Sequence, residues 1–107
     1  MSNSIRAAVV AWSKSLSEDI AADGITINSI LTGYFDTERI EQLNAAKAKS
    51  LNISESKVLS EMKKMVPANR LGKPEEYGYL VAFLASNNAA YINGTAIPID
   101  GGLLKSV

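Results

Sequence analysis

The chain has 107 residues, the size of one small domain, and its 11 basic residues balance its 11 acidic residues. This balance gives no reason to expect nucleic acid or a membrane surface as a partner, and no apolar stretch reaches the length of a membrane span. Cysteine and histidine are both absent, which excludes disulfides, thiol nucleophiles and the usual zinc ligands. We therefore expect a soluble, cytoplasmic protein with no metal site.

The first predicted element is a helix over residues 5–22. Its larger apolar residues recur every three or four positions, which is typical of one helical stripe. Gly24 follows at a position suited to a left-handed helix end. Because the stripe starts so close to Met1, we expect the chain to begin inside an element. The stripe consists of Ile5, Val9, Trp12, Leu16 and Ile20.

Residues 25–31 are mostly apolar and β-branched, which predicts a buried strand that ends in a turn at Thr32-Gly33. Residues 38–66 carry two helical patterns. Asn52 and Glu55 have the spacing of a capping box for the second of these helices, and the proline that follows it is expected to end it.

A further helix is predicted from Pro74 to about Asn87, because proline and acidic residues favour the first turn of a helix. Residues 95–100 predict a second strand, at the edge of a sheet because Pro98 has no N–H to donate. A strand, helices and a strand predict an α/β fold with two parallel strands joined by a right-handed crossover. Two strands are too few for a parallel sheet, so the first is expected to need another neighbour.

Four stretches follow one another along residues 1–107: Arg6 to Leu16; Gly24 to Ile30 with Gly33 and Thr37; Arg70 to Glu76; and Tyr91 to Gly94 with Asp100 to Gly102. Together they resemble the short-chain dehydrogenase/reductase family. The first is similar to the helix after the family's Tyr-x-x-x-Lys motif, and the others are similar to GI-x-VN-x-(I/V)-x-PG-x-(I/V)-x-T, R-x-G-x-PEE and YI-x-G…DGG. The similarity implies one unit, the C-terminal portion of a doubly wound, Rossmann-like parallel sheet, similar to the 3-oxoacyl-carrier-protein reductase branch. Residues 38–66 would then be the helical substrate lid.

The resemblance implies that the complete protein is an oxidoreductase that uses NAD or NADP for hydride transfer to or from a carbonyl or hydroxyl of a small-molecule substrate. The loop after the first strand is expected to contact the nicotinamide end of the cofactor through Thr32, Gly33, Phe35 and Thr37. Thr32 replaces the family's proline, which removes a preset φ angle. The glycine-rich phosphate loop does not occur in this sequence, so we expect this chain alone to bind no cofactor tightly and to be inactive.

The family's catalytic tyrosine and lysine fall at Ser2 and Arg6 when Asn28 is matched to the Asn of the family's strand motif. A serine hydroxyl is far less acidic than a phenol, so Ser2 is a poor general acid. Arg6 can carry charge and bind a ribose hydroxyl of the cofactor, but it is always protonated and cannot shuttle a proton. The alternative is that Ser2 caps the first helix and Arg6 is an exposed charge.

A second hypothesis is a non-catalytic scaffold or subunit that associates with itself and is derived from the same fold. The resemblance places the first helix at a two-fold interface, and Ala7, Ala8 and Ala11 would allow close approach beside Val9 and Trp12. A homo-oligomer is therefore expected. The alternative is that Trp12 packs into the chain's own core.

Overall fold

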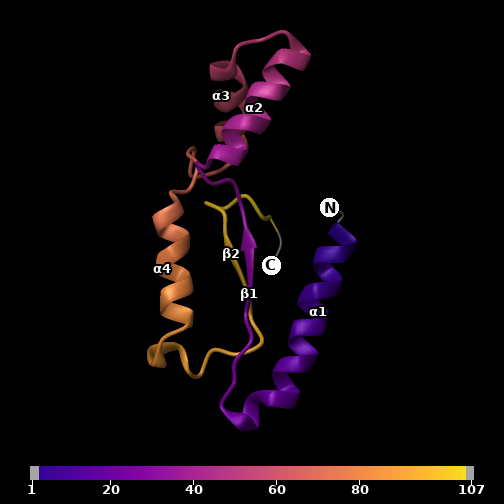
Figure 1. Cartoon of the computed structure of the whole chain (residues 1–107), viewed down its shortest axis with the longest axis vertical. Coiled ribbons are helices and arrows are strands. Elements are labelled where there is room, and N and C mark those ends of the chain that lie inside the picture. Colours follow the sequence, from indigo (N-terminus) through magenta and orange to yellow (C-terminus); the bar gives the residue numbers. More distant parts are fainter. Residues whose placement is uncertain (1–2, 106–107) are drawn as a thin grey trace. The chain divides into compact units, whose positions relative to one another are not determined.

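The computed structural model describes residues 3–105. Within this range the chain forms four α-helices, two short 3-10 helices and two strands, and three of the α-helices lie between the strands in the sequence (Figure 1). No helix in this range is long and apolar enough to cross a membrane. In chain order the elements are α1 (Asn3–Ile20), η1 (Ala21–Asp23), β1 (Ser29–Thr32), α2 (Glu38–Leu51), α3 (Glu55–Met65), α4 (Pro74–Leu84), η2 (Asn87–Ala89) and β2 (Ala96–Ile99).

The chain divides into two compact units. Unit 1 combines the chain up to Leu31 with residues 79–98, and unit 2 combines residues 32–78 with the chain from Ile99 onward. Unit 1 therefore holds α1 and most of both strands, while unit 2 holds α2, α3 and the loop that follows β1.

The two strands lie side by side in one sheet. The Ser29 N–H donates to the Thr95 carbonyl at 2.8 Å and the Gly33 N–H donates to the Ile99 carbonyl at 3.1 Å, so the strands run parallel. Backbone groups alternate in direction along a strand, so Pro98 faces away from β1 and costs no ladder hydrogen bond. The α/β prediction with two parallel strands is confirmed.

The first strand is shorter and more exposed than the sequence predicted. Residues 25–28 are not strand, because side chains pair with their backbone in place of a neighbouring strand: the Asn93 Oδ1 accepts from the Ile27 N–H at 3.0 Å. Ile25 is exposed and residues 29–31 are only half-buried. The expectation of a buried strand over residues 25–31 was therefore wrong in both respects.

Helix α1 confirms the first predicted helix, and Gly24 ends the helical segment with a φ of 76°. The described side chains that the helix buries are Ser13 and Ser17. Their hydroxyls donate hydrogen bonds to the carbonyls of Val9 and Lys14, respectively. The predicted apolar stripe instead leaves Trp12 63% exposed, which excludes the alternative that Trp12 packs into the chain's own core.

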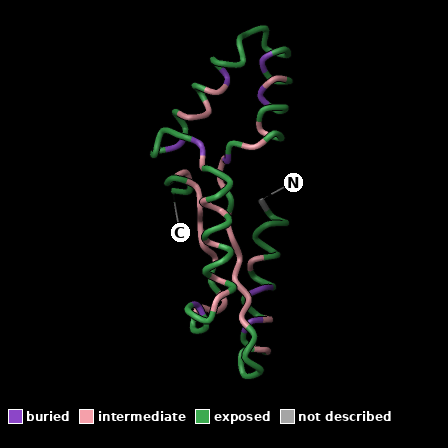
Figure 2. Tube along the Cα trace, turned by 60° about the vertical axis from the view of Figure 1, so that its left-hand side comes forward, coloured by how far each residue is buried: buried purple, intermediate pink, exposed green. Residues whose placement is uncertain are grey.

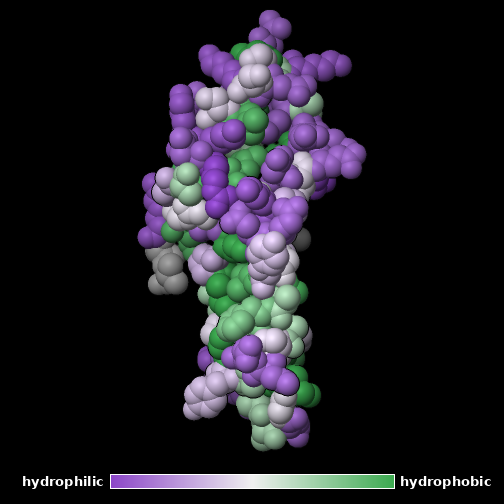
Figure 3. Space-filling model, turned by 90° about the vertical axis from the view of Figure 1, so that its left-hand side faces the viewer, coloured by the Kyte–Doolittle hydropathy of each residue, from purple (hydrophilic) through white to green (hydrophobic). Residues whose placement is uncertain are grey.

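Unit 1 buries little apolar surface. Among its described residues Ala89 is the one buried hydrophobic side chain, and most of α1 is exposed (Figure 2). On the face drawn in Figure 3, hydrophobic residues gather in the lower half over α4, whereas hydrophilic residues cover α2 and α3. The large hydrophobic side chains that unit 1 exposes are Ile5, Val9, Trp12, Ile25, Tyr79, Val81, Phe83 and Tyr91.

Unit 2 contains the helical hairpin predicted for residues 38–66, in which α2 and α3 pack through Ala48 and Val58. The predicted capping box at Asn52 was wrong. Asn52 adopts a left-handed conformation with a φ of 57° and ends α2, while the Ser54 hydroxyl accepts from the Lys57 N–H and begins α3. Both residue types can cap a helix, and their places in the three-residue connection between the helices decide which end each serves.

Candidate functional site

The loop after β1 is held by the segment that precedes α4, and both belong to unit 2. The Gly72 N–H donates to the Tyr34 carbonyl at 2.9 Å, and the Asp36 N–H donates to the Gly72 carbonyl at 2.8 Å. Phe35 and Gly72 thereby form an isolated parallel bridge. This pairing fixes the backbone of the loop although Thr32 stands where the family has a proline.

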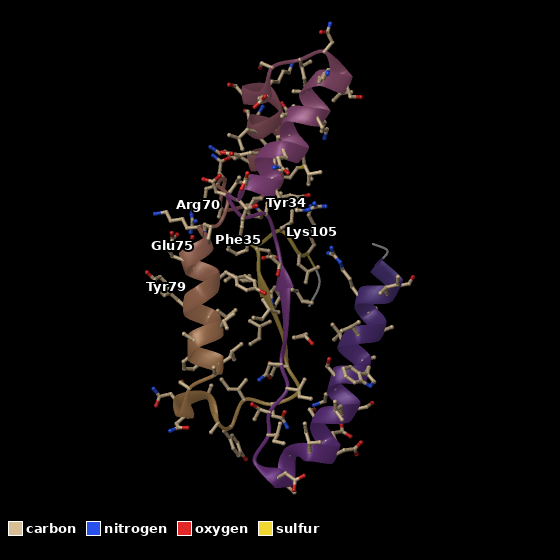
Figure 4. All side chains as sticks on the ribbon, viewed as in Figure 1. Tyr34, Phe35, Arg70, Glu75, Tyr79 and Lys105 are labelled. Atoms are coloured by element: carbon tan, nitrogen blue, oxygen red, sulfur yellow. The ribbon has the colours of Figure 1, made fainter. Side chains whose placement is uncertain are left out.

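The Phe35 side chain anchors the loop (Figure 4). It is 8% exposed, and its ring lies so close to Gly72 that a Cβ there would meet the ring Cε2 at 2.6 Å. The ring also meets Tyr77 of α4 edge-on, with 5.6 Å between the ring centroids. The Phe35 side chain is thus used for packing, and only the backbone N–H and carbonyl of Phe35 could contact a ligand.

Gly33 lets the loop approach the end of β2. A Cβ at this position would lie 2.5 Å from the Asp100 Cβ and 2.6 Å from the Asp100 Cα, so only glycine fits without a backbone shift. Asp100 is itself fixed, because its carboxylate accepts from the N–H groups of Gly102 and Leu104 at 2.9 and 2.8 Å. The loop is therefore held on two sides, by Gly72 and by Asp100.

Arg70 and Glu76 form a bidentate ion pair at the start of α4. The two N···O distances are 2.7 and 3.0 Å, and Glu76 also accepts from the Lys73 N–H at 2.9 Å. The hydrogen bond from Arg70, followed by that from the Lys73 backbone, lowers the pKa of Glu76 from 4.5 to about 2. The pair fixes the turn that carries Gly72, and so supports the loop indirectly.

A small hollow lies between these segments, with a volume of about 60 Å³. This is room for a few waters or one small polar group, and far below the roughly 300 Å³ or more of a typical ligand pocket. The hollow by itself is therefore too small to enclose a ligand of ordinary size. The hollow is lined by Tyr34, Phe35, Ala68, Arg70, Gly72, Glu76, Ile99, Asp100 and Gly101.

Of the residues predicted to contact the cofactor, Thr32, Gly33, Phe35 and Thr37 lie in or beside this loop, whereas Arg6 does not. Thr32 is the exposed last residue of β1, and Thr37 begins α2, with its hydroxyl accepting from the Ile40 N–H at 3.3 Å. Arg6 is exposed on α1 in unit 1, and Ser2 lies outside the described residues. Their proposed catalytic roles stay predictions.

The sequence reasoning passed over the residues that hold the loop, namely Gly72, Asp100 and the Arg70–Glu76 pair. The Arg-x-Gly-x-Pro-Glu-Glu and Asp-Gly-Gly stretches contain these residues, but on the sequence alone they are interpreted only as family motifs. What the sequence could not show is that these stretches meet the loop after β1.

The family model described as "Enoyl-(Acyl carrier protein) reductase" matches residues 1–104 of this chain. The NADPH-dependent reductase BacG of Bacillus subtilis is 37% identical over 103 residues, which are 96% of this chain and 40% of BacG. The 3-oxoacyl-[acyl-carrier-protein] reductase FabG of Haemophilus influenzae is 40% identical over 101 residues, which are 94% of this chain and 37% of FabG. The chain thus spans about two fifths of the length of these relatives.

A solved structure shows the same likeness in three dimensions. The crystal structure of a short chain dehydrogenase family protein from Francisella tularensis superimposes with a TM-score of 0.86 at 34% identity. The match covers 91% of this chain and 40% of that protein. Fold and sequence therefore agree on which part of the larger proteins this chain resembles.

Gly33→Ala is expected to destabilise the chain by about 1–3 kcal/mol, because the added methyl meets the Asp100 backbone and must displace it. Gly78→Ala is the matched control: it lies within α4 with no atom within 4 Å of the added Cβ, and it should stabilise the chain by about 1 kcal/mol. Urea unfolding followed by circular dichroism measures both, and equal effects of the two changes would refute the close approach.

The Arg70–Glu76 pair predicts a loss of stability in acid. Because the pKa of Glu76 is lowered on folding, its contribution is complete above its ordinary pKa of 4.5 and disappears as the pH falls towards 2. Glu76→Gln should flatten the decline in unfolding midpoint over this range, whereas Glu75→Gln in the same helical turn should leave it unchanged. Identical pH profiles for Glu76→Gln and the unmodified chain would contradict the pairing.

Proposed function

This chain belongs to the short-chain dehydrogenase/reductase family, and from that premise we propose that it forms the C-terminal part of an NAD(P)-dependent oxidoreductase. The proposed reaction is hydride transfer between the cofactor and a carbonyl or hydroxyl group of a small-molecule substrate. The observation that carries the proposal is the rigid loop at the carboxyl end of β1, the edge of a parallel sheet at which such folds bind ligands.

The loop offers groups that suit the nicotinamide end of a dinucleotide. The backbone of residues 33–36 is fixed by Gly72 and Asp100, so its polar groups need little reordering when a ligand binds. Thr37 accepts from Ile40 but can still donate its hydroxyl hydrogen, and it stands at the N-terminus of a 14-residue helix, where negative charge is favoured. The bound cofactor would supply or accept the hydride.

The other parts of the site follow from this placement. We assign the α2–α3 hairpin as the substrate lid, because it directly follows the loop and packs through few buried side chains. The dinucleotide phosphates need a glycine-rich loop that this sequence lacks, so the chain alone should bind cofactor weakly and not turn over. Ser2 and Arg6, at the positions of the family's tyrosine and lysine, would in any case be poor proton donors.

A chimera tests the proposed function. When this chain replaces the matched 40% of BacG, the chimera should bind NADPH in a calorimetric titration but turn over slowly. Ser2→Tyr with Arg6→Lys should then raise turnover by about 10²–10⁴-fold, because a tunable phenol replaces an alkanol hydroxyl. Ser2→Phe with Arg6→Lys is the control that lacks only the hydroxyl. A folded chimera without measurable NADPH affinity would contradict the proposal.

A second candidate function, self-association as a scaffold, is favoured by one observation. Val9 and Trp12 are 53% and 63% exposed, and they lie three positions apart, on the same face of α1. In a two-fold symmetric dimer, this apolar face of one copy would be buried against the same face of the other copy. The two functions do not exclude each other, because they use different residues: α1 belongs to unit 1 and the loop after β1 belongs to unit 2.

Sedimentation at high micromolar concentration tests the association. The unmodified 107-residue chain should sediment as a dimer or larger species, and Trp12→Asp should shift it to the monomer, because a buried unpaired charge opposes association. Ser15→Asp, an exposed position of the same helix, is the control and should leave the mass unchanged. A compact monomer formed by the unmodified chain would show that α1 is not an interface.

A further inference from the structure

Asn93 joins three segments of unit 1 through its side chain. Its Oδ1 accepts from the Ile27 N–H at 3.0 Å, and its Nδ2 donates to the Ser17 carbonyl at 3.2 Å. Ser17 lies near the end of α1, Ile27 precedes β1 and Asn93 precedes β2. The Asn93 amide therefore takes the place of a strand neighbour at this end of the sheet, and both its oxygen and its nitrogen are hydrogen-bonded.

The residue after Asn93 must be glycine. Gly94 has a φ of 72°, and a Cβ on it would lie 2.7 Å from the Ser17 Oγ and 2.9 Å from the Lys14 Nζ. Its N–H donates to the Ile27 carbonyl at 2.8 Å. The fold thus requires an Asn-Gly pair, the dipeptide in which a backbone nitrogen most easily attacks the preceding side-chain amide, since glycine has no side chain to hinder the ring closure.

We propose that Asn93 is a conditional modification site, protected while unit 1 is folded and deamidated once this part of the chain opens. The Gly94 nitrogen bonds to the Asn93 Cγ and loses its proton, while the Cγ–Nδ2 bond breaks and ammonia leaves. Water then adds to either carbonyl of the five-membered imide and opens it. The product is aspartate or, when the backbone carbonyl is attacked, isoaspartate.

The folded state blocks this reaction at both reacting groups. The Gly94 N–H points at the Ile27 carbonyl, and the Asn93 amide is held between Ile27 and Ser17, so the nitrogen cannot approach the Cγ without breaking these bonds. A second pairing closes the same turn, in which the Asn28 Oδ1 accepts from the Thr95 hydroxyl at 2.6 Å and from its N–H at 3.1 Å. Opening this turn is therefore the step that exposes Asn93.

The modification cannot be reversed by refolding. A carboxylate has no hydrogen to donate to the Ser17 carbonyl, and it brings a negative charge against an acceptor. Isoaspartate also lengthens the backbone by one carbon between the Cα of residue 93 and the Gly94 nitrogen, which displaces the Gly94 N–H from the Ile27 carbonyl. A chain that deamidates while unit 1 is open is thus permanently changed, so the rate of this damage depends on how often unit 1 opens.

Deamidation of the purified chain tests this proposal. The unmodified chain is incubated in mildly alkaline buffer with and without urea and is then digested. Mass spectrometry of the peptides that contain Asn93 measures deamidation, and chromatography separates the aspartate from the isoaspartate form. The reaction should be at least about tenfold slower without urea, because only the opened fraction reacts. Equal rates in the two conditions would overturn the proposal.

Two variants locate the opening. Asn28→Ala removes the pairing with Thr95 and should speed deamidation of Asn93 in buffer without urea, while its rate in urea stays that of the unmodified chain. Ser54→Ala removes the N-cap of α3 in unit 2 and should leave the rate at Asn93 unchanged. Acceleration of the same size in both variants would contradict control by the closure of unit 1.

Discussion

The burial of apolar side chains in unit 1 is the constraint on which the rest of the account depends. Val9 and Trp12 of α1, Phe83 of α4 and Tyr91 before β2 are exposed, while the described part of unit 1 buries only one hydrophobic side chain, Ala89. Exposed apolar surface of this extent marks an interaction site in a soluble protein. In the proposed function, a second copy of the chain would cover Val9 and Trp12, and the part of the fold that the matched relatives contain besides this one would cover the other exposed side chains.

Unit 2 is less dependent on such cover, which is why the candidate site is already formed. Phe35, Val66 and Leu71 are buried within it, and Gly72 and Asp100 hold the loop after β1 from two sides. The proposed division of labour follows. In the proposed oxidoreductase, contacts inside this chain would shape the nicotinamide end of the cofactor site, whereas the sequence contains no glycine-rich loop to hold the phosphates.

The sequence predicted the elements whose signals are local. The periodicity of α1, the left-handed Gly24 and the first turn of α4 at Pro74 all depend on neighbouring residues, and all were found. The start of β1 depends on a distant partner and was misread, because Asn93 pairs with the backbone before Ser29. The cap of α3 was misread at a local signal, since Ser54 rather than Asn52 begins that helix. The Arg70–Glu76 pair and the Gly33–Asp100 contact likewise needed the fold to bring separate motifs together.

Hydrogen exchange at β1 tests the central claim most directly. The Ser29 and Gly33 N–H groups bond to β2, so by alternation those of Ile30 and Thr32 point to the other edge, where a completed parallel sheet would pair them. The account predicts that Ile30 and Thr32 exchange quickly in the 107-residue chain and slowly in the chimera with BacG, while Ser29 and Gly33 are protected in both. Fast exchange of Ile30 and Thr32 in a folded chimera would show that this edge of β1 is not an interior surface.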